Sequence, residues 1–242
     1  MELAVKAGYQ AYAIDLPPFG YSAPPVSGDY SKPMQAKRLL AAMDNIGVKR
    51  AVFVAHSFGA APVMEALMAD PQRASALVLV DAALGMDGPQ TDGSDGGLQR
   101  MLRSQLLSEA ISAAFLTNPD FTKILLQSFI SEKEKATTDW VSLYQKPLSL
   151  SGSYQNIALW LPELLSRRGT AKSDDIAAYA KLSFPVTLIW GETDTVTPLA
   201  QAIHLQALMP GAKLITIPKA GHIPQIEAPE AFQGSLRTAL KR

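Results

Sequence analysis

The sequence predicts an α/β protein, in which a mostly parallel sheet has helices on both faces and an all-helical insertion interrupts the core. Toward both ends of the 242-residue chain, short apolar runs alternate with helical patterns, as in βα units. The runs are continuous, which indicates strands that are covered on both faces. Between Leu84 and Leu182 this alternation stops. We therefore expect a core made of residues 1–84 and 182–242, and a helical cap (lid) at 85–181.

The elements of the core follow from local patterns. Five apolar runs of strand length predict strands at Ala11–Asp15, Ala51–Ala55, Ala76–Val80, Val186–Trp190 and Lys213–Ile217. Apolar residues at helical spacing predict helices at Pro33–Ile46, Phe58–Ala69, Leu199–Met209 and Pro229–Leu240. Ser31 is the expected N-cap of the first helix, because a serine hydroxyl can accept a hydrogen bond from a free backbone N–H.

The insertion begins with a connection rich in glycine and aspartate, Gly85–Gly97. Its residues are ordinary turn formers and lack the alternating ligands and closing glutamate of an EF-hand, so we expect a solvated hinge and no metal. Amphipathic helices are predicted after it, at Leu98–Phe115, Asp120–Ile130, Glu132–Leu143 and Trp160–Leu165, and Asp174–Lys181 leads back to the sheet.

Composition narrows the classes of function. The 22 basic and 22 acidic side chains cancel, which argues against nucleic acid or an acidic membrane surface as a partner. The chain has no cysteine, so disulfides, thiolate zinc sites and a cysteine nucleophile are excluded. No apolar stretch reaches the roughly 18 residues that a membrane span requires. Because no secretory signal is present at the N-terminus either, we expect a cytoplasmic protein.

A serine stands at the sharpest junction of the chain. In Ala55-His56-Ser57-Phe58-Gly59, an apolar strand ends at Ser57 and a helix begins at once. Small residues two positions before and after the serine allow the tight turn of a nucleophile elbow, although Ala55 replaces the usual first glycine. Such a turn exposes the serine hydroxyl, and it places the Phe58 N–H where it could stabilise a negative oxygen.

A serine nucleophile needs a base, and that base needs an orienting acid. His222 follows the last predicted strand, at the sheet edge where ligands bind in open α/β folds, whereas His204 has the profile of an exposed helix residue. Asp194 follows the preceding strand on the same edge and is the favoured acid, with Glu192 as the alternative. The order serine, aspartate, histidine is the one that accompanies this elbow.

These segments, in this order, resemble the α/β-hydrolase superfamily over nearly the whole chain. Asp15–Ser22 is similar to that family's loop after strand four, and the Gly221-His222 segment with Glu227 is similar to its histidine segment. The resemblance implies that Ser57 is the nucleophile, Asp194 the acid and His222 the base, with the Phe58 N–H in the oxyanion hole.

The resemblance also implies three earlier strands and a His-Gly loop that this sequence lacks. The chain starts at what looks like the following helix, Leu3–Gly8, so we expect about 30–50 residues to be absent. Ala51–Ala55 would then either pair directly with Ala11–Asp15 or present a bare edge. One oxyanion donor instead of two would lower the rate by about 10²–10³.

Two classes of function fit these features. The first is a serine hydrolase of carboxylic esters or related carbonyl compounds, which include carbon–carbon cleavage substrates of capped relatives. The second is a truncated, catalytically weak or inactive ligand-binding protein. The apolar insertion favours a neutral or hydrophobic acyl substrate. No cofactor is implied, because the triad needs none and no dinucleotide-binding glycine pattern follows a strand. Candidate substrate contacts are His56, Trp140, Trp160 and Ile223.

Overall fold

The computed structural model describes residues 1–85, 101–164 and 171–241. In these ranges four strands form one parallel sheet in the order β1-β2-β3-β4. The strands are β1 (Ala51–His56), β2 (Ala74–Val80), β3 (Val186–Gly191) and β4 (Lys213–Ile217). Each lies where an apolar run predicts it. All residues of β3 are buried, as expected of a strand with cover on both faces.

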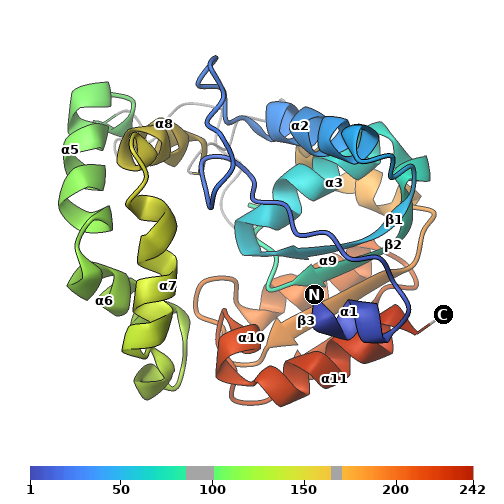
Figure 1. The fold of residues 1–242 in the computed structure, drawn as a ribbon. Helices are drawn as coiled ribbons and strands as arrows, with labels where there is room; N and C mark the ends of the chain where they lie inside the picture. Colours follow the sequence, from blue (N-terminus) through green and yellow to red (C-terminus); the bar gives the residue numbers. More distant parts are fainter. Residues whose placement is uncertain (86–100, 165–170, 242) are drawn as a thin grey trace.

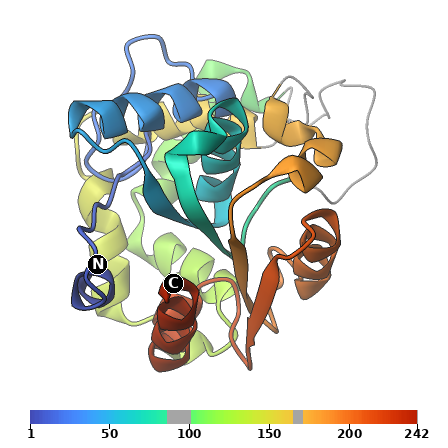
Figure 2. The ribbon, with the colours of Figure 1, turned by 90° about the vertical axis from the view of Figure 1, so that its right-hand side faces the viewer.

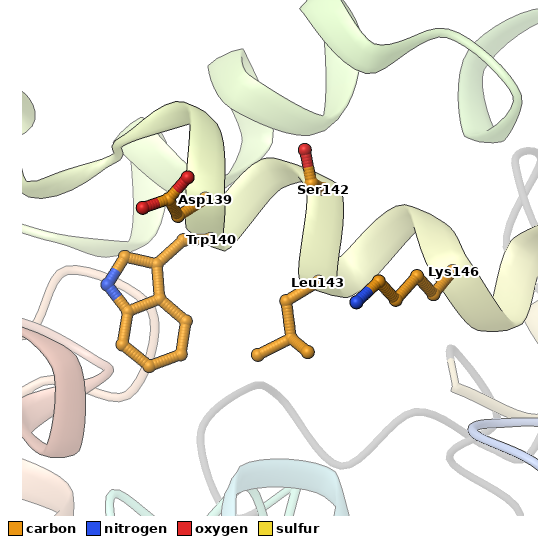
Figure 3. Close-up of a pocket in the computed structure, with 5 residues that line it drawn as sticks. All are labelled: Asp139, Trp140, Ser142, Leu143 and Lys146. Atoms are coloured by element: carbon orange, nitrogen blue, oxygen red, sulfur yellow. The ribbon is translucent and has the colours of Figure 1, made fainter.

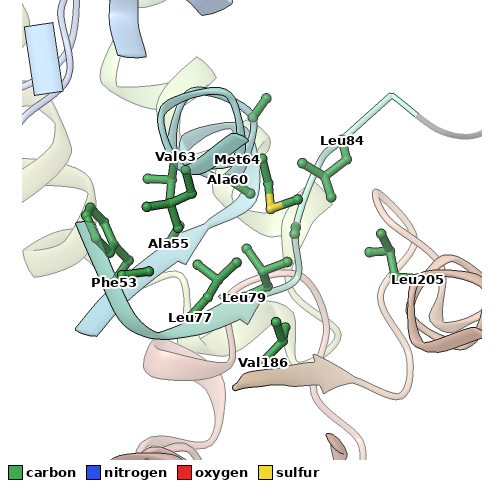
Figure 4. Close-up of a cluster of buried hydrophobic side chains, with 14 of the residues drawn as sticks. Phe53, Ala55, Ala60, Val63, Met64, Leu77, Leu79, Leu84, Val186 and Leu205 are labelled. Atoms are coloured by element: carbon green, nitrogen blue, oxygen red, sulfur yellow. The ribbon is translucent and has the colours of Figure 1, made fainter. Parts of the chain in front are cut away.

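Helices cover both faces of the sheet (Figures 1 and 2). On one face, α2 (Lys32–Asn45), α3 (Ala60–Ala69) and α9 (Leu199–Leu208) enclose the main core. Figure 4 shows part of this core, in which Met64 of α3 lies beside Leu79 of β2, and Leu205 of α9 belongs to the same cluster. On the other face, α11 (Pro229–Leu240) packs on Val78, Val80 and Ile189. The prediction of a doubly covered α/β sheet is confirmed.

The N-terminal segment does not form the predicted strand Ala11–Asp15. After the short helix α1 (Glu2–Lys6), residues 9–16 have no regular secondary structure. Tyr12 and Ile14 are 45% and 41% exposed. A strand is stable only when its N–H and C=O groups pair with a neighbour, and in the described ranges β1 pairs with β2 alone. The sequence predicts that β1 either pairs with Ala11–Asp15 or leaves one edge unpaired. In the described ranges the second arrangement is found.

A layer of helices stands beside the sheet (Figure 1). It contains α5 (Gln105–Leu116), α6 (Pro119–Phe129), α7 (Thr138–Leu148) and α8 (Ser153–Leu164). The predicted helices of the insertion lie in this layer with shifted ends. Most of the predicted Gly-rich connection, the start of the helix predicted from Leu98 and the residue Leu165 lie outside the described residues.

Two smaller features complete the fold. Ser31 precedes α2, but its side chain makes no capping hydrogen bond; instead its N–H donates to Asp29, so this prediction is wrong. The short helix α10 (Pro224–Glu227) links β4 to α11. None of the helices in the described ranges combines the length and the apolarity that a membrane crossing requires.

Candidate active site

Ser57 lies directly after β1 in a strained backbone conformation. Its φ is +51°, in the left-handed region that side-chain-bearing residues rarely adopt. The Ser57 carbonyl accepts a hydrogen bond at 3.0 Å from the N–H of Ala83, which lies in the segment after β2. Such strain clusters at functional sites, where the surrounding fold holds it. The conformation is compatible with the predicted nucleophile elbow, and the role of Ser57 as nucleophile stays a prediction.

His222 reaches this site from the segment after β4. The ends of β3 and β4 approach so closely that a Cβ added at Gly191 would lie 2.1 Å from the Gly221 carbonyl oxygen. The Thr193 N–H also donates to the Ala220 carbonyl at 3.0 Å. Glycine at position 191 is therefore needed to bring the two segments together. His222 is only 2% exposed.

Asp194 contacts His222, and the alternative acid does not. Asp194 Oδ1 accepts hydrogen bonds from the N–H groups of Val196 and Thr197 at 2.7 and 2.9 Å, and Asp194 Oδ2 accepts one from the Thr197 hydroxyl at 2.6 Å. Glu192 is exposed and accepts the Thr216 hydroxyl. Burial raises the pKa of Asp194, but hydrogen bonds from His222 and Thr197 outweigh it and hold that pKa below its ordinary value.

A continuous hydrogen-bond chain joins the three predicted residues. Ser57 Oγ lies 2.7 Å from His222 Nε2, and His222 Nδ1 lies 2.8 Å from Asp194 Oδ2. An ionised Asp194 accepts the Nδ1 proton, which leaves Nε2 free to accept the serine proton. This arrangement therefore allows a proton to pass from the serine hydroxyl to the imidazole.

Phe58 places its backbone at the start of the helical segment that follows the serine. A 3₁₀ turn at Ser57–Gly59 continues into α3, so the free N–H groups of the helix start lie beside Ser57. The Phe58 ring packs edge-on against Trp160 of α8, with ring centroids 4.9 Å apart. Phe19 completes this aromatic cluster at 4.7 Å from Trp160. The cluster fixes one wall of the site.

The loop that carries Phe19 is held by its own aspartate. Asp15 Oδ2 accepts the Tyr21 N–H at 2.9 Å, and the Asp15 carbonyl accepts the Ser22 hydroxyl at 2.6 Å. At Gly20, where φ is +60°, a Cβ would lie 2.0 Å from the Asp15 carboxyl carbon. The Asp15–Ser22 motif seen in the sequence is therefore a turn that aims Phe19 at the site.

His56 contacts the site through a hydrogen bond to the backbone of His222. Its Nε2 lies 2.7 Å from the His222 carbonyl oxygen, and the two rings lie 5.2 Å apart. Burial lowers the pKa of His56 to about 4, against the opposing effect of that hydrogen bond. His56 is therefore neutral near pH 7, and its Nε2–H donates to His222.

A cavity of about 2540 Å³ opens above Ser57 and extends along the free edge of β1. Three of the four candidate contacts, His56, Trp160 and Ile223, line it. Trp140 instead packs in the cluster of Ile130, Ile223 and Ile226. It lines a separate hollow of about 440 Å³ along α7 (Figure 3), whose described lining residues are Asp139, Trp140, Ser142, Leu143 and Lys146.

One buried acid near the site could not be found from the sequence. Asp81 follows β2 with a φ of +42° and is fully buried. Its Oδ1 accepts the Gly191 N–H at 2.8 Å. Burial raises the pKa of Asp81 to about 9, and the negative charges of Asp194 and Glu227 add to this effect. Asp81 is therefore a neutral carboxylic acid at pH 7.

The fold and the contact of serine, histidine and aspartate define an α/β enzyme of the hydrolase class. The sequence model of the alpha/beta hydrolase fold family matches residues 1–229. The chain therefore belongs to the α/β hydrolase fold family, as the sequence motifs predict.

Among curated proteins, the chain is 27% identical over 240 residues to a 2-hydroxy-6-oxononadienedioate/2-hydroxy-6-oxononatrienedioate hydrolase of Comamonas testosteroni. That alignment covers 94% of this chain and 76% of the relative. It is 25% identical over 236 residues to a pimeloyl-[acyl-carrier protein] methyl ester esterase of Aliivibrio fischeri, with 97% and 84% covered. The relatives thus include a hydrolase of an oxo-dienedioate and a methyl ester esterase.

Solved structures share the fold. A bromoperoxidase from Bacillus anthracis matches with a TM-score of 0.76 at 17% identity, over 100% of this chain and 85% of that one. The meta-cleavage product hydrolase from Pseudomonas fluorescens matches with a TM-score of 0.69 at 20% identity, over 91% of this chain and 75% of its own. At these identities the similarity concerns the fold alone.

Proposed function

We propose that this chain is a serine hydrolase that cleaves carboxylic esters through an acyl-enzyme on Ser57. The observation that carries the proposal is the hydrogen-bond chain from Ser57 Oγ through His222 to Asp194, with links of 2.7 and 2.8 Å. Those distances are within reach for direct proton transfer. The strained φ of Ser57, +51°, supports a nucleophile held in place by the fold.

In the first half of the reaction, Ser57 Oγ bonds to the ester carbonyl carbon while its proton passes to His222 Nε2. The carbonyl oxygen becomes an oxyanion, which the Phe58 N–H and the start of the helical segment stabilise. The bond to the alcohol oxygen then breaks, and the imidazolium gives its proton to the departing alkoxide. Asp194 stabilises the imidazolium in between.

In the second half, water attacks the acyl carbon and gives a proton to His222 Nε2. The bond between the acyl carbon and Ser57 Oγ breaks, and that oxygen regains the proton. The products are a carboxylic acid and an alcohol. Their atoms come from the ester and one water molecule, so this reaction needs no cofactor.

The helical layer α5–α8 serves in this proposal as a cap over the site, formed within residues 85–181. Its Trp160 lines the cavity and packs on Phe58, the residue next to the nucleophile. The described charged residues that line the cavity, Asp15, Lys49, Arg50 and Lys241, belong to other segments. An apolar cap favours a hydrophobic acyl group, with a small-molecule ester as substrate.

A second candidate is hydrolysis of a carbon–carbon bond, because the Comamonas testosteroni relative is a hydrolase of a dienedioate. The same three residues would serve, with a carbon leaving group in place of the alcohol. A dienedioate carries two carboxylates, and the apolar cap accommodates these charged groups less well than it accommodates a neutral acyl chain. The apolar cap therefore favours an ester substrate.

Turnover of p-nitrophenyl butyrate tests the proposal. Ser57→Ala removes the nucleophile, and we expect turnover to fall by at least about 10³-fold. Ser151→Ala is the matched control, because Ser151 is exposed on the turn before α8. Wild-type protein that is folded but has no turnover above the Ser57→Ala level would contradict an esterase and favour a binding protein. Turnover of a dienedioate in preference to the ester would favour the second candidate.

A further inference from the structure

Glu227 is a buried carboxylate outside the hydrogen-bond chain of the proposed triad. It ends α10, five residues after His222, and is only 1% exposed. A buried carboxylate is costly unless hydrogen bonds satisfy its oxygens. Backbone N–H groups from two separate parts of the chain do so here.

One of its oxygens binds the histidine loop, which we define as Ala220–His222. Glu227 Oε2 accepts the Gly221 N–H at 2.5 Å. The bond fixes the residue directly before the proposed base. Because a hydrogen bond to a charged acceptor is stronger than one between neutral groups, this contact restricts where the His222 backbone can lie.

The other oxygen binds the clasp segment, defined as Phe129–Lys135, which joins α6 to α7. Glu227 Oε1 accepts the Ser131 N–H at 2.5 Å and the Glu132 N–H at 2.8 Å. The Lys135 ammonium donates to the Glu227 backbone carbonyl. A single carboxylate therefore ties the helical layer to the histidine loop. Figure 1 shows α10 on the side of the core that faces α6 and α7.

Further contacts make the two segments one unit. The His222 N–H donates to the Phe129 carbonyl at 2.7 Å, and the Phe129 ring lies 5.6 Å from the His222 ring. A Cβ added at Gly221 would lie 2.8 Å from the Phe129 carbonyl oxygen, so only glycine fits this approach. The position of His222 is thus set from the helical layer as well as from the sheet.

We propose that Glu227 is a positioning residue, which couples the clasp segment to the histidine loop and so holds His222 in line with Ser57. The inference rests on the proposed hydrolase function. It adds that the helical layer contributes to the geometry of the proton relay and not only to the walls of the cavity. A shift of about 1 Å in such a group can lower a rate by about 10²-fold.

The first test is the kinetics of Glu227→Gln on p-nitrophenyl butyrate. An amide nitrogen cannot accept a hydrogen bond, so at least one of the three N–H groups loses its acceptor whichever way the amide lies. We expect kcat to fall at least about tenfold with KM changed by less than about twofold, because the relay and not the cavity is altered. Glu230→Gln is the matched control, since Glu230 is exposed three residues later, and it should keep wild-type kcat.

A second pair of variants tests the coupling to the helical layer. Glu132 has a φ of −88°, close to the range that proline adopts, so Glu132→Pro removes the cap-side N–H with little strain. Glu132→Ala keeps that N–H and removes only the side chain. We expect Glu132→Pro to lower kcat about threefold or more, and Glu132→Ala to leave it unchanged. Glu227→Ala removes both carboxylate oxygens and therefore always breaks the bond from the Glu132 N–H. Adding Glu132→Pro to Glu227→Ala should therefore lower kcat no further.

The outcomes separate this inference from the function on which it rests. Wild-type turnover that does not depend on Ser57 would defeat the proposed hydrolase. Ser57-dependent turnover with unchanged kcat in folded Glu227→Gln would overturn the positioning role alone, even if that variant melted at a lower temperature. Additive effects of Glu132→Pro and Glu227→Ala would overturn the coupling.

Discussion

Replacing Asp81 by asparagine is expected to make the protein less sensitive to rising pH. Asp81 is fully buried after β2, and burial raises its pKa from 3.8 to about 9. Between these two values the native state keeps a proton that the unfolded state has lost. Folding stability therefore falls as pH rises through this window, because the unfolded state binds fewer protons.

The magnitude follows from the width of the window. One extra proton on the native state lowers the free energy of unfolding by about 1.4 kcal/mol for each pH unit. From about pH 5 to about pH 8 this amounts to about 4 kcal/mol, a large part of the 5–15 kcal/mol that domains typically have. Asparagine has a similar shape, accepts the Gly191 N–H equally and tolerates the positive φ at this position. It does not titrate.

Urea unfolding of Asp81→Asn and wild type at three pH values measures this effect. We expect the stability difference to shift in favour of the variant by about 4 kcal/mol between about pH 5 and about pH 8. Asp139→Asn is the control, because Asp139 is exposed on the first turn of α7. A difference between Asp81→Asn and wild type that stays constant across this range would refute the assignment of Asp81 as a buried neutral acid.

Three further predictions concern the proposed site. Asp194→Asn should lower kcat on p-nitrophenyl butyrate by about 10⁴-fold, because an amide favours the wrong imidazole tautomer, while Glu192→Gln should leave it near wild type; similar losses in both would contradict the choice of acid. His222→Ala should lower turnover at least about 10²-fold, and His204→Ala, on the exposed face of α9, should not; equal rates in the two variants would remove His222 from the mechanism. Trp160→Ala should destabilise the fold by about 3–5 kcal/mol in thermal or urea unfolding, and an unchanged midpoint would contradict its role in the aromatic cluster.

The sequence predicts the four strands of the sheet because each has an apolar run of strand length, and the run of β3 is buried along its whole length. Ala11–Asp15 has a similar composition, but among the described residues no strand pairs with it. A ladder requires a partner strand, which the local pattern cannot reveal. Ser31 likewise has the chemistry of a cap, yet its hydroxyl makes no capping bond.

The contact of Ser57, His222 and Asp194 could be anticipated, since the carboxyl ends of parallel strands meet at one edge of the sheet. The roles of Asp81 and Glu227 could not. Each depends on an approach between segments far apart in sequence, as when Glu227 accepts the Ser131 N–H. Trp140 shows the same limit, because only the packing of α7 against Ile223 and Ile226 places its ring outside the cavity.

Mass spectrometry after treatment with a fluorophosphonate is the most direct test of the central claim, that residue 57 carries an activated nucleophile. Such a reagent phosphonylates a serine only where a neighbouring base accepts its proton. We expect one adduct per chain, located in the peptide that contains Ser57 and lost in His222→Ala. An adduct on a different residue, or labelling of Ser57 that proceeds at the wild-type rate without His222, would contradict the account.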